Sequence, residues 1–246
     1  MSLMISSANP ISGTADPVAP LQLKRDVRQL LDCLYTGGVG IVPLDVAYAI
    51  VGSCEGAIRR IFNAKNRSYE KPSGLIASVE MSEEIHVLPE EKRSMIREMI
   101  AHEKLPFSVV APFRSTHSFF VRVDPFVMQN STKAQTLDML LNAGVVHDEL
   151  ARQSWAAGRP VFGSSANTSL KGSKYRIQDI EAGVRDSADI ILDYGLSKYA
   201  NPEGRSSTII DFRDFSVIRV GVCFDQLSAA FERRFGISLS RSVAKQ

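Results

Sequence analysis

The chain has 246 residues, of which 44% are hydrophobic and 23% charged, as in ordinary globular proteins. This length suits one large domain with a substantial core. Twenty-nine basic and 27 acidic residues leave a formal charge of +2, so the overall charge neither indicates nor excludes a nucleic-acid partner. No segment approaches the apolar length that a membrane span needs, and we expect a cytoplasmic protein with no membrane partner.

We predict a flexible arm over residues 1–20, because this segment is rich in Ser, Ala, Pro and Gly. It lacks the charged start and apolar core of a secretory signal. One catalytic domain is expected over residues 21–236, followed by a short tail over residues 237–246. The three cysteines are far apart in the sequence, so we expect reduced thiols without a catalytic role.

Apolar periodicity predicts alternating helices and strands. Leucine and valine recur at helical spacing from Leu23 to Leu34, and Gly37 can end that helix. A strand at 39–43 then turns through Leu44 and Asp45 into a second apolar run. Further helices are expected at 58–62, 89–103, 177–184 and 224–235, and further strands at 74–79, 160–163, 190–192, 207–211 and 217–220.

The middle of the chain carries two longer patterns. Segments 107–113 and 118–124 are β-like and are separated by a short polar turn, which predicts an antiparallel hairpin. Segment 128–158 looks mainly helical, with three leucines of residues 137–141 on one face. Together the elements predict a single-domain α/β fold with a twisted mixed sheet flanked by helices.

Two polar clusters follow apolar runs and lie roughly a hundred residues apart. The first is cationic and the second offers hydroxyl and amide groups, a combination that suits a polyanion such as a nucleoside triphosphate. Each also has a plainer interpretation, as a solvated helix end and as a turn bonded to its own backbone. The clusters are Lys65, Arg67 and Lys71, and Ser164, Ser165 and Asn167.

A third polar element, residues 205–208, places hydroxyls beside an arginine at the head of a strand. Three such loops in one domain favour a ligand site. The phosphate-loop and dinucleotide fingerprints are absent from the sequence, so another architecture would hold a nucleotide. The four histidines share no ligand spacing with carboxylates, and no serine nucleophile elbow is present, so we expect neither a side-chain metal site nor a serine hydrolase.

The order of these motifs resembles the YrdC-like family of threonylcarbamoyl-adenylate synthases, from about Gly37 to Gly221. Segment 43–50 resembles the family's opening strand-turn-strand. The other matching segments are 60–67, which resembles a helix leading into a lysine-x-arginine motif; Lys71-Pro72, a lysine-proline pair; Ser165-Ala166-Asn167, a serine-x-asparagine motif; Ser207 to Asp211, a serine-threonine strand; and Arg219-Val220-Gly221, a closing arginine-x-glycine.

The resemblance implies an enzyme that joins L-threonine, bicarbonate and ATP into threonylcarbamoyl-adenylate and releases pyrophosphate. Partner threonylcarbamoyl-transferase proteins would then modify tRNA. Positioning and cations, with phosphate-bound Mg²⁺, suffice for this chemistry without a covalent nucleophile. The implied catalytic residues are Lys65, Arg67, Ser165 and Asn167. The implied nucleotide-binding residues are Lys71, Ser164, Ser207, Thr208 and Arg219, and the implied substrate-binding residues are Asp45, Tyr48, Ser108 and Arg122.

Some positions depart from the family pattern. Leu44 and Val46 stand where the family carries two threonines, and Asp124 replaces the proline of an arginine-x-proline motif that begins at Arg122. The nucleotide side therefore matches the family better than the threonine side does. Two alternatives stay open: a nucleotide- or double-stranded-RNA-binding paralogue without turnover, and carbamoyl-adenylate chemistry with another acceptor.

Overall fold

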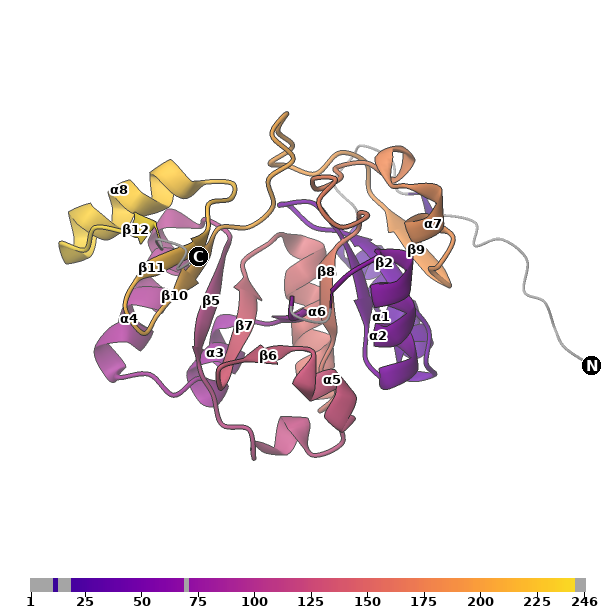
Figure 1. Cartoon of the computed structure of the whole chain (residues 1–246), viewed down its shortest axis with the longest axis horizontal. Helices are drawn as coiled ribbons and strands as arrows, with labels where there is room; N and C mark the ends of the chain where they lie inside the picture. The colour runs from indigo at the N-terminus through magenta and orange to yellow at the C-terminus, as the bar shows by residue number, and fades with distance from the viewer. Residues whose placement is uncertain (1–10, 13–18, 69–70, 242–246) are drawn as a thin grey trace, which may run out of the picture.

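The computed structural model describes residues 11–12, 19–68 and 71–241 (Figure 1). The helices are α1 Pro20–Tyr35, α2 Glu55–Ala64, α3 Val79–Ile85, α4 Glu90–Glu98, α5 Pro125–Gln129, α6 Val145–Ala156, α7 Ala182–Arg185 and α8 Phe224–Phe235. The strands are β1 Ile11–Ser12, β2 Gly40–Pro43, β3 Tyr48–Gly52, β4 Gly74–Ile76, β5 Phe107–Pro112, β6 Thr132–Lys133, β7 Thr136–Leu141, β8 Phe162–Ser165, β9 Ile190–Asp193, β10 Ile209–Asp211, β11 Ser216–Arg219 and β12 Ser240–Arg241.

The strands form one mixed sheet in the order β1-β9-β2-β3-β8-β4-β7-β5-β10-β11-β12, with β6 paired to β7. Both parallel and antiparallel neighbours occur, so the predicted mixed sheet is confirmed. Every residue of β2 and β3 is buried, because helices cover these central strands. Helices α1 and α2 lie toward the β2 end of the sheet and α8 toward the β11 end (Figure 1). Among the described residues, no helix combines the length and apolar character required to cross a bilayer.

Helix α1 ends where its sequence predicts. Gly37 adopts a φ of +97°, and its N–H donates to the carbonyl of Leu34 at 3.1 Å. The N–H of Gly38 closes the same turn onto the carbonyl of Cys33 at 2.9 Å. These bonds satisfy carbonyl groups at the helix end and redirect the chain into β2.

The predicted arm and tail both contribute described strands. Strand β1, from the arm, pairs in parallel with β9. Strand β12, from the tail, pairs in parallel with β11. The remaining residues of the arm, 1–10 and 13–18, and the end of the tail, 242–246, lie outside the described residues.

The predicted hairpin of 107–113 with 118–124 is wrong. Residues 107–112 do form β5, but 118–120 form a 3-10 turn, and the antiparallel partner of β5 is β7. Strand β7 in turn lies in the stretch 128–158 that was predicted to be mainly helical. Only the second half of that stretch forms a long helix, α6.

The alternation of side chains explains β7. Leu137, Met139 and Leu141 are fully buried, whereas Asp138 and Leu140 are partly exposed, which is the two-residue period of a strand. Leucines at 137, 140 and 141 also fit helical spacing, so a short apolar run of this kind is ambiguous. Pairing with β5 and β4 on either side decides in favour of the strand.

We predict that Leu137→Ala and Met139→Ala each lower the free energy of unfolding by about 2 to 5 kcal/mol, because both side chains are fully buried in β7. Leu140→Ala should cost less than about 1.5 kcal/mol, since Leu140 is only partly buried. Urea unfolding of the three variants measures the difference. A large loss for Leu140→Ala with a small loss for Met139→Ala would support a helical face instead.

Candidate functional site

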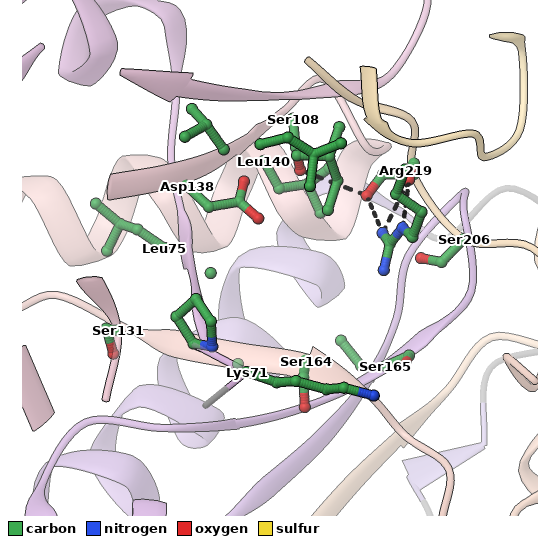
Figure 2. Close-up of a pocket in the computed structure, with 18 of the residues that line it drawn as sticks. Lys71, Leu75, Ser108, Ser131, Asp138, Leu140, Ser164, Ser165, Ser206 and Arg219 are labelled. Carbon is green, nitrogen blue, oxygen red and sulfur yellow. Dashed lines mark hydrogen bonds between the residues drawn. The ribbon is translucent and has the colours of Figure 1, made fainter. Parts of the chain in front are cut away.

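A cavity of about 800 Å³ opens over the centre of the sheet, between β3, β4, β5, β7 and β8 and the loops beside them. The polar loops predicted from the sequence meet here. The predicted site residues that line it are Tyr48, Lys65, Arg67, Lys71, Ser108, Ser164, Ser165, Asn167, Ser207 and Arg219. Figure 2 shows Ser108 and Arg219 on one side of the cavity, with Lys71, Ser164 and Ser165 across from them.

Lys65 fastens the first polar loop to the second. It follows the last turn of α2, and its side chain is only 1% exposed. Its ammonium group donates to the carbonyl of Asn167 at 2.6 Å and to the carbonyl of Ser165. Burial, and then the charge of Arg67, lower the pKa of Lys65 to about 7, while Glu181 acts in the opposite direction. Lys65 therefore links the two loops through hydrogen bonds. A bound anion would favour its charged form near neutral pH.

Arg67 braces the turn that follows the first loop. Its Nε donates to the carbonyl of Lys71 at 3.0 Å, and a terminal nitrogen donates to the carbonyl of Pro72 at 2.8 Å. Burial, and then the charge of Arg219, lower the pKa of Arg67 to about 10. Lys71 is exposed at the rim. The first cluster thus contains one buried, one half-buried and one exposed cation, and all three line the same cavity.

Several polar atoms at the cavity are buried without a hydrogen-bond partner among the described residues. They are Oγ of Ser131, Ser164 and Ser169, Oδ1 of Asn167 and Oδ1 of Asp138. Buried polar groups in folded proteins are normally bonded to protein or water. Their concentration at one cavity indicates a site for a polar ligand.

Arg219 and Ser207 form the opposite wall. Arg219 donates from Nε and a terminal nitrogen to the carbonyl of Ser207, at 3.0 and 2.8 Å, and to the Ser207 hydroxyl at 2.9 Å. The hydroxyl of Ser108 lies 3.4 Å from that of Ser207. The surrounding protein lowers the pKa of Arg219, and Asp138 counteracts this shift. The hydrogen bonds to Ser207 thus hold the guanidinium group in place before a ligand binds.

Thr208 supports this wall from behind. It is fully buried, donates its hydroxyl hydrogen to the carbonyl of Val222 at 2.9 Å, and accepts from the N–H of Gly221 at 3.1 Å. Thr208 does not line the cavity. Its position suits a role in fixing the turn that directly follows β11 and Arg219 rather than direct contact with a ligand.

Three predicted substrate-binding residues present no polar group to the cavity. The hydroxyl of Tyr48 lies 2.7 Å from Oδ1 of Asp193 and is bonded there, although the tyrosine lines the cavity. Asp45 lies outside the lining, and its backbone N–H donates to the carbonyl of Ala143 at 2.7 Å. Arg122 is exposed just after the 3-10 turn and also lies outside the lining.

Strand β7 contributes residues that the sequence interpretation missed. Thr136, Asp138 and Leu140 all line the cavity. Burial raises the pKa of Asp138, whereas Arg219, Ser108 and Arg67 act to lower it. The residues from 137 to 141 gave no clear signal for this strand, because their apolar spacing also fits a helix and the pairing with β5 and β4 is nonlocal.

In the described ranges, no three histidine, cysteine, aspartate or glutamate side chains are grouped so as to hold a metal ion.

The chain is similar in sequence and in fold to known proteins. Residues 32–221 match the Sua5, YciO and YrdC family model, which is described as telomere recombination. A hypothetical protein from Streptococcus mutans matches with a TM-score of 0.72 and 17% identity, over 96% of this chain and 98% of that chain. No curated protein sequence that was compared matches the chain.

Two further solved structures share the fold. P. abyssi Sua5 complexed with L-threonine matches with a TM-score of 0.67 and 22% identity, over 89% of this chain and 59% of that chain. Full-length HypF in the phosphate- and nucleotide-bound form matches with a TM-score of 0.58 and 14% identity, over 79% of this chain and 28% of that chain. The chain thus spans less than two thirds of both relatives.

We predict that the buried charge of Lys65 makes stability depend on pH. In the folded chain the Lys65 ammonium group loses its proton near its pKa of about 7, whereas in the unfolded chain it keeps the proton up to the ordinary lysine pKa of 10.5. Folding releases the proton between these values, so the free energy of unfolding should rise with pH by up to about 1.4 kcal/mol per pH unit. Lys65→Met should abolish this contribution, which urea unfolding at pH 7.5 and 9.0 measures.

Lys71→Met is the matched control, because Lys71 is a lysine of the same cavity with an exposed side chain. It should preserve the pH dependence of the wild type. Identical pH dependence in the wild type and in Lys65→Met would contradict the assignment of the shift to Lys65.

Proposed function

The chain belongs to the Sua5, YciO and YrdC family, and we propose on that basis that it joins L-threonine, bicarbonate and ATP into threonylcarbamoyl-adenylate and releases pyrophosphate. The observation that carries the proposal is one cavity where Lys65, Arg67 and Arg219 face the hydroxyl and amide groups of the Ser164–Asn167 loop. A polyanion and a small polar substrate are the ligands that such a lining suits.

The proposed chemistry needs positioned charge more than a nucleophile. The amino nitrogen of threonine would first form a bond to the carbon of bicarbonate, with loss of water, to give the N-carboxylate. An oxygen of this new carbamate group would then form a bond to the α-phosphorus of ATP, while the bond from that phosphorus to the leaving pyrophosphate breaks. Negative charge then grows on the phosphate oxygens. Arg219, already held by Ser207, and Arg67, held by its own turn, would stabilise that charge without having to reorganise.

The Ser164–Asn167 loop would orient the substrates. No described residue bonds to the Ser164 hydroxyl, which can therefore donate to a phosphate or carboxylate oxygen. The Asn167 amide nitrogen already donates to the carbonyl of Thr168 at 2.6 Å, whereas its Oδ1 has no partner among the described residues and would accept from a donor on the ligand. Magnesium, bound through the phosphates, would neutralise part of the triphosphate charge.

In this proposal the product is a reactive mixed anhydride, which partner proteins in the cytoplasm would use directly. Partner threonylcarbamoyl-transferase proteins would move its activated group to tRNA. The L-threonine complex of Sua5 supports threonine as the amino acid, and nucleotide-bound HypF supports nucleotide use on this fold.

Purified protein should release pyrophosphate from ATP and bicarbonate only when L-threonine is present. Lys65→Ala and Asn167→Ala should each lower kcat/KM by at least about 100-fold, because each disrupts the loop that positions both substrates. Arg28→Ala, on an exposed position of α1, serves as the control with unchanged activity. Nucleotide binding without pyrophosphate release under any amino acid would instead indicate a binding paralogue.

Because of Leu44 and Val46, the enzyme should discriminate only weakly between threonine and an analogue that lacks its hydroxyl group. Both line the cavity and are 4% and 1% exposed, so the wall they form is apolar. We expect the wild type to prefer threonine over 2-aminobutanoate, which lacks the hydroxyl, by less than about tenfold in kcat/KM. The double variant Leu44→Thr, Val46→Thr should raise that ratio at least about tenfold.

Leu44→Val is the matched control for this pair. Valine has the shape of threonine, so Leu44→Val reproduces the volume of the double variant without either hydroxyl. It should leave the ratio unchanged. Strong discrimination by the wild type would show that another group reads the hydroxyl.

A further inference from the structure

The carboxylate of Asp138 lies among the cations of the cavity. Asp138 lies in the middle of β7, opposite Val110 of β5, and Figure 2 shows its side chain directed into the space between the two walls. Arg67 and Arg219 are close enough to influence its ionisation. A negative charge here opposes the binding of phosphate groups, so a site for a polyanion alone does not explain it.

Asp138 forms no ion pair with a neighbouring side chain in the part of the chain that the structure describes. Within the described part of the chain, no lysine, arginine or histidine nitrogen lies within 4.0 Å of it, and its Oδ1 is buried without a hydrogen bond. Asp211 lines the same cavity and differs in this respect, because Arg213 lies 2.6 Å from its carboxylate. Leaving a buried carboxylate oxygen unpartnered is costly, and such a group is normally completed by a ligand.

Gly74 keeps the carboxylate accessible. It stands on β4 beside β7, and a Cβ at this position would lie 3.5 Å from Oδ2 of Asp138. Because glycine has no side chain, the sheet surface next to the carboxylate stays open. A small group of a ligand can therefore reach Asp138 from this side.

We propose that Asp138 accepts hydrogen bonds from the α-ammonium group of the amino-acid substrate and so makes the cavity select an amino acid over the corresponding acid. This proposal rests on the proposed function and specifies how its second substrate is recognised. An ammonium group suits the geometry because it offers three donors and one positive charge in a small volume. Arg67 and Arg219 would face the anionic groups of the same ligands.

A magnesium ion fits the position less well. Mg²⁺ keeps several water ligands in such sites, and the side chains that line the cavity beside Asp138 include the apolar Leu140 and Val110, which accept no hydrogen bond from those waters. The two nearby arginines would also repel a divalent cation twice as strongly as an ammonium group. Direct metal binding by Asp138 is therefore an outcome that the experiment must distinguish.

The test compares L-threonine with 3-hydroxybutanoate, which is threonine without its amino group. Isothermal titration calorimetry of the wild type should show tighter binding of threonine by about 10- to 100-fold. Asp138→Asn, which keeps the shape but removes the charge, should reduce that preference to less than about threefold. It should also bind ATP at least as tightly as the wild type, because a repelling charge is removed.

Two further variants separate contact from general electrostatics. Asp214→Asn removes a carboxylate from the rim of the same cavity and should keep the preference for threonine. Gly74→Ala keeps every charge but places a methyl group beside the Asp138 carboxylate, and it should lower threonine affinity without weakening ATP binding.

The outcomes distinguish this inference from the proposed function. Threonine-dependent pyrophosphate release together with an unchanged threonine preference in Asp138→Asn would overturn the role of Asp138 alone. A preference that depends on Asp138, without pyrophosphate release, would overturn the synthase and keep the amino-group site. Loss of the Mg²⁺ dependence of ATP binding in Asp138→Asn, with the threonine preference intact, would assign the carboxylate to the metal instead.

Discussion

The site depends on the buried ammonium group of Lys65. Its side chain donates to the carbonyls of Ser165 and Asn167, while the N–H of Ser169 donates back to the carbonyl of Lys65 at 2.8 Å. These bonds join the end of α2 to the loop after β8, so the cationic cluster and the hydroxyl cluster keep a fixed separation. A lysine that is 1% exposed makes this possible because burial removes competing water.

The charged groups of the cavity destabilise the free protein but favour the binding of charged ligands. Burial lowers the pKa of Lys65, Arg67 and Arg219, and the charge of Arg219 lowers the pKa of Arg67 further. Cations that lie close together repel one another and lower the free energy of unfolding unless an anion binds between them. Binding sites are commonly less stable than the rest of a fold for this reason. Asp138 offsets part of this repulsion. The lining therefore carries both signs of charge, which suits a triphosphate and a zwitterion together better than a triphosphate alone.

Local signals in the sequence predicted much of this arrangement. Gly37 and the leucine spacing before it define α1, and the polar loops at Lys65 and Ser165 follow apolar runs that place them at one cavity. Strand β7 was missed because its pairing with β5 and β4 is nonlocal, and leucine spacing alone fits a helix too. Asp138 was missed with it. The bond from the Tyr48 hydroxyl to Asp193 spans 145 residues and likewise leaves no local signal.

The separation of Lys65 from its partners has a consequence for folding. The two bonds close loops of 100 and 102 residues, so forming them costs chain entropy that the sheet between them must offset. Contacts of such high sequence separation are characteristic of slow, topology-limited folding. A partly folded chain therefore has the cations and the hydroxyls but not the cavity. Ligands that need both loops stabilise only the completed fold, so their binding reports on the integrity of the whole domain.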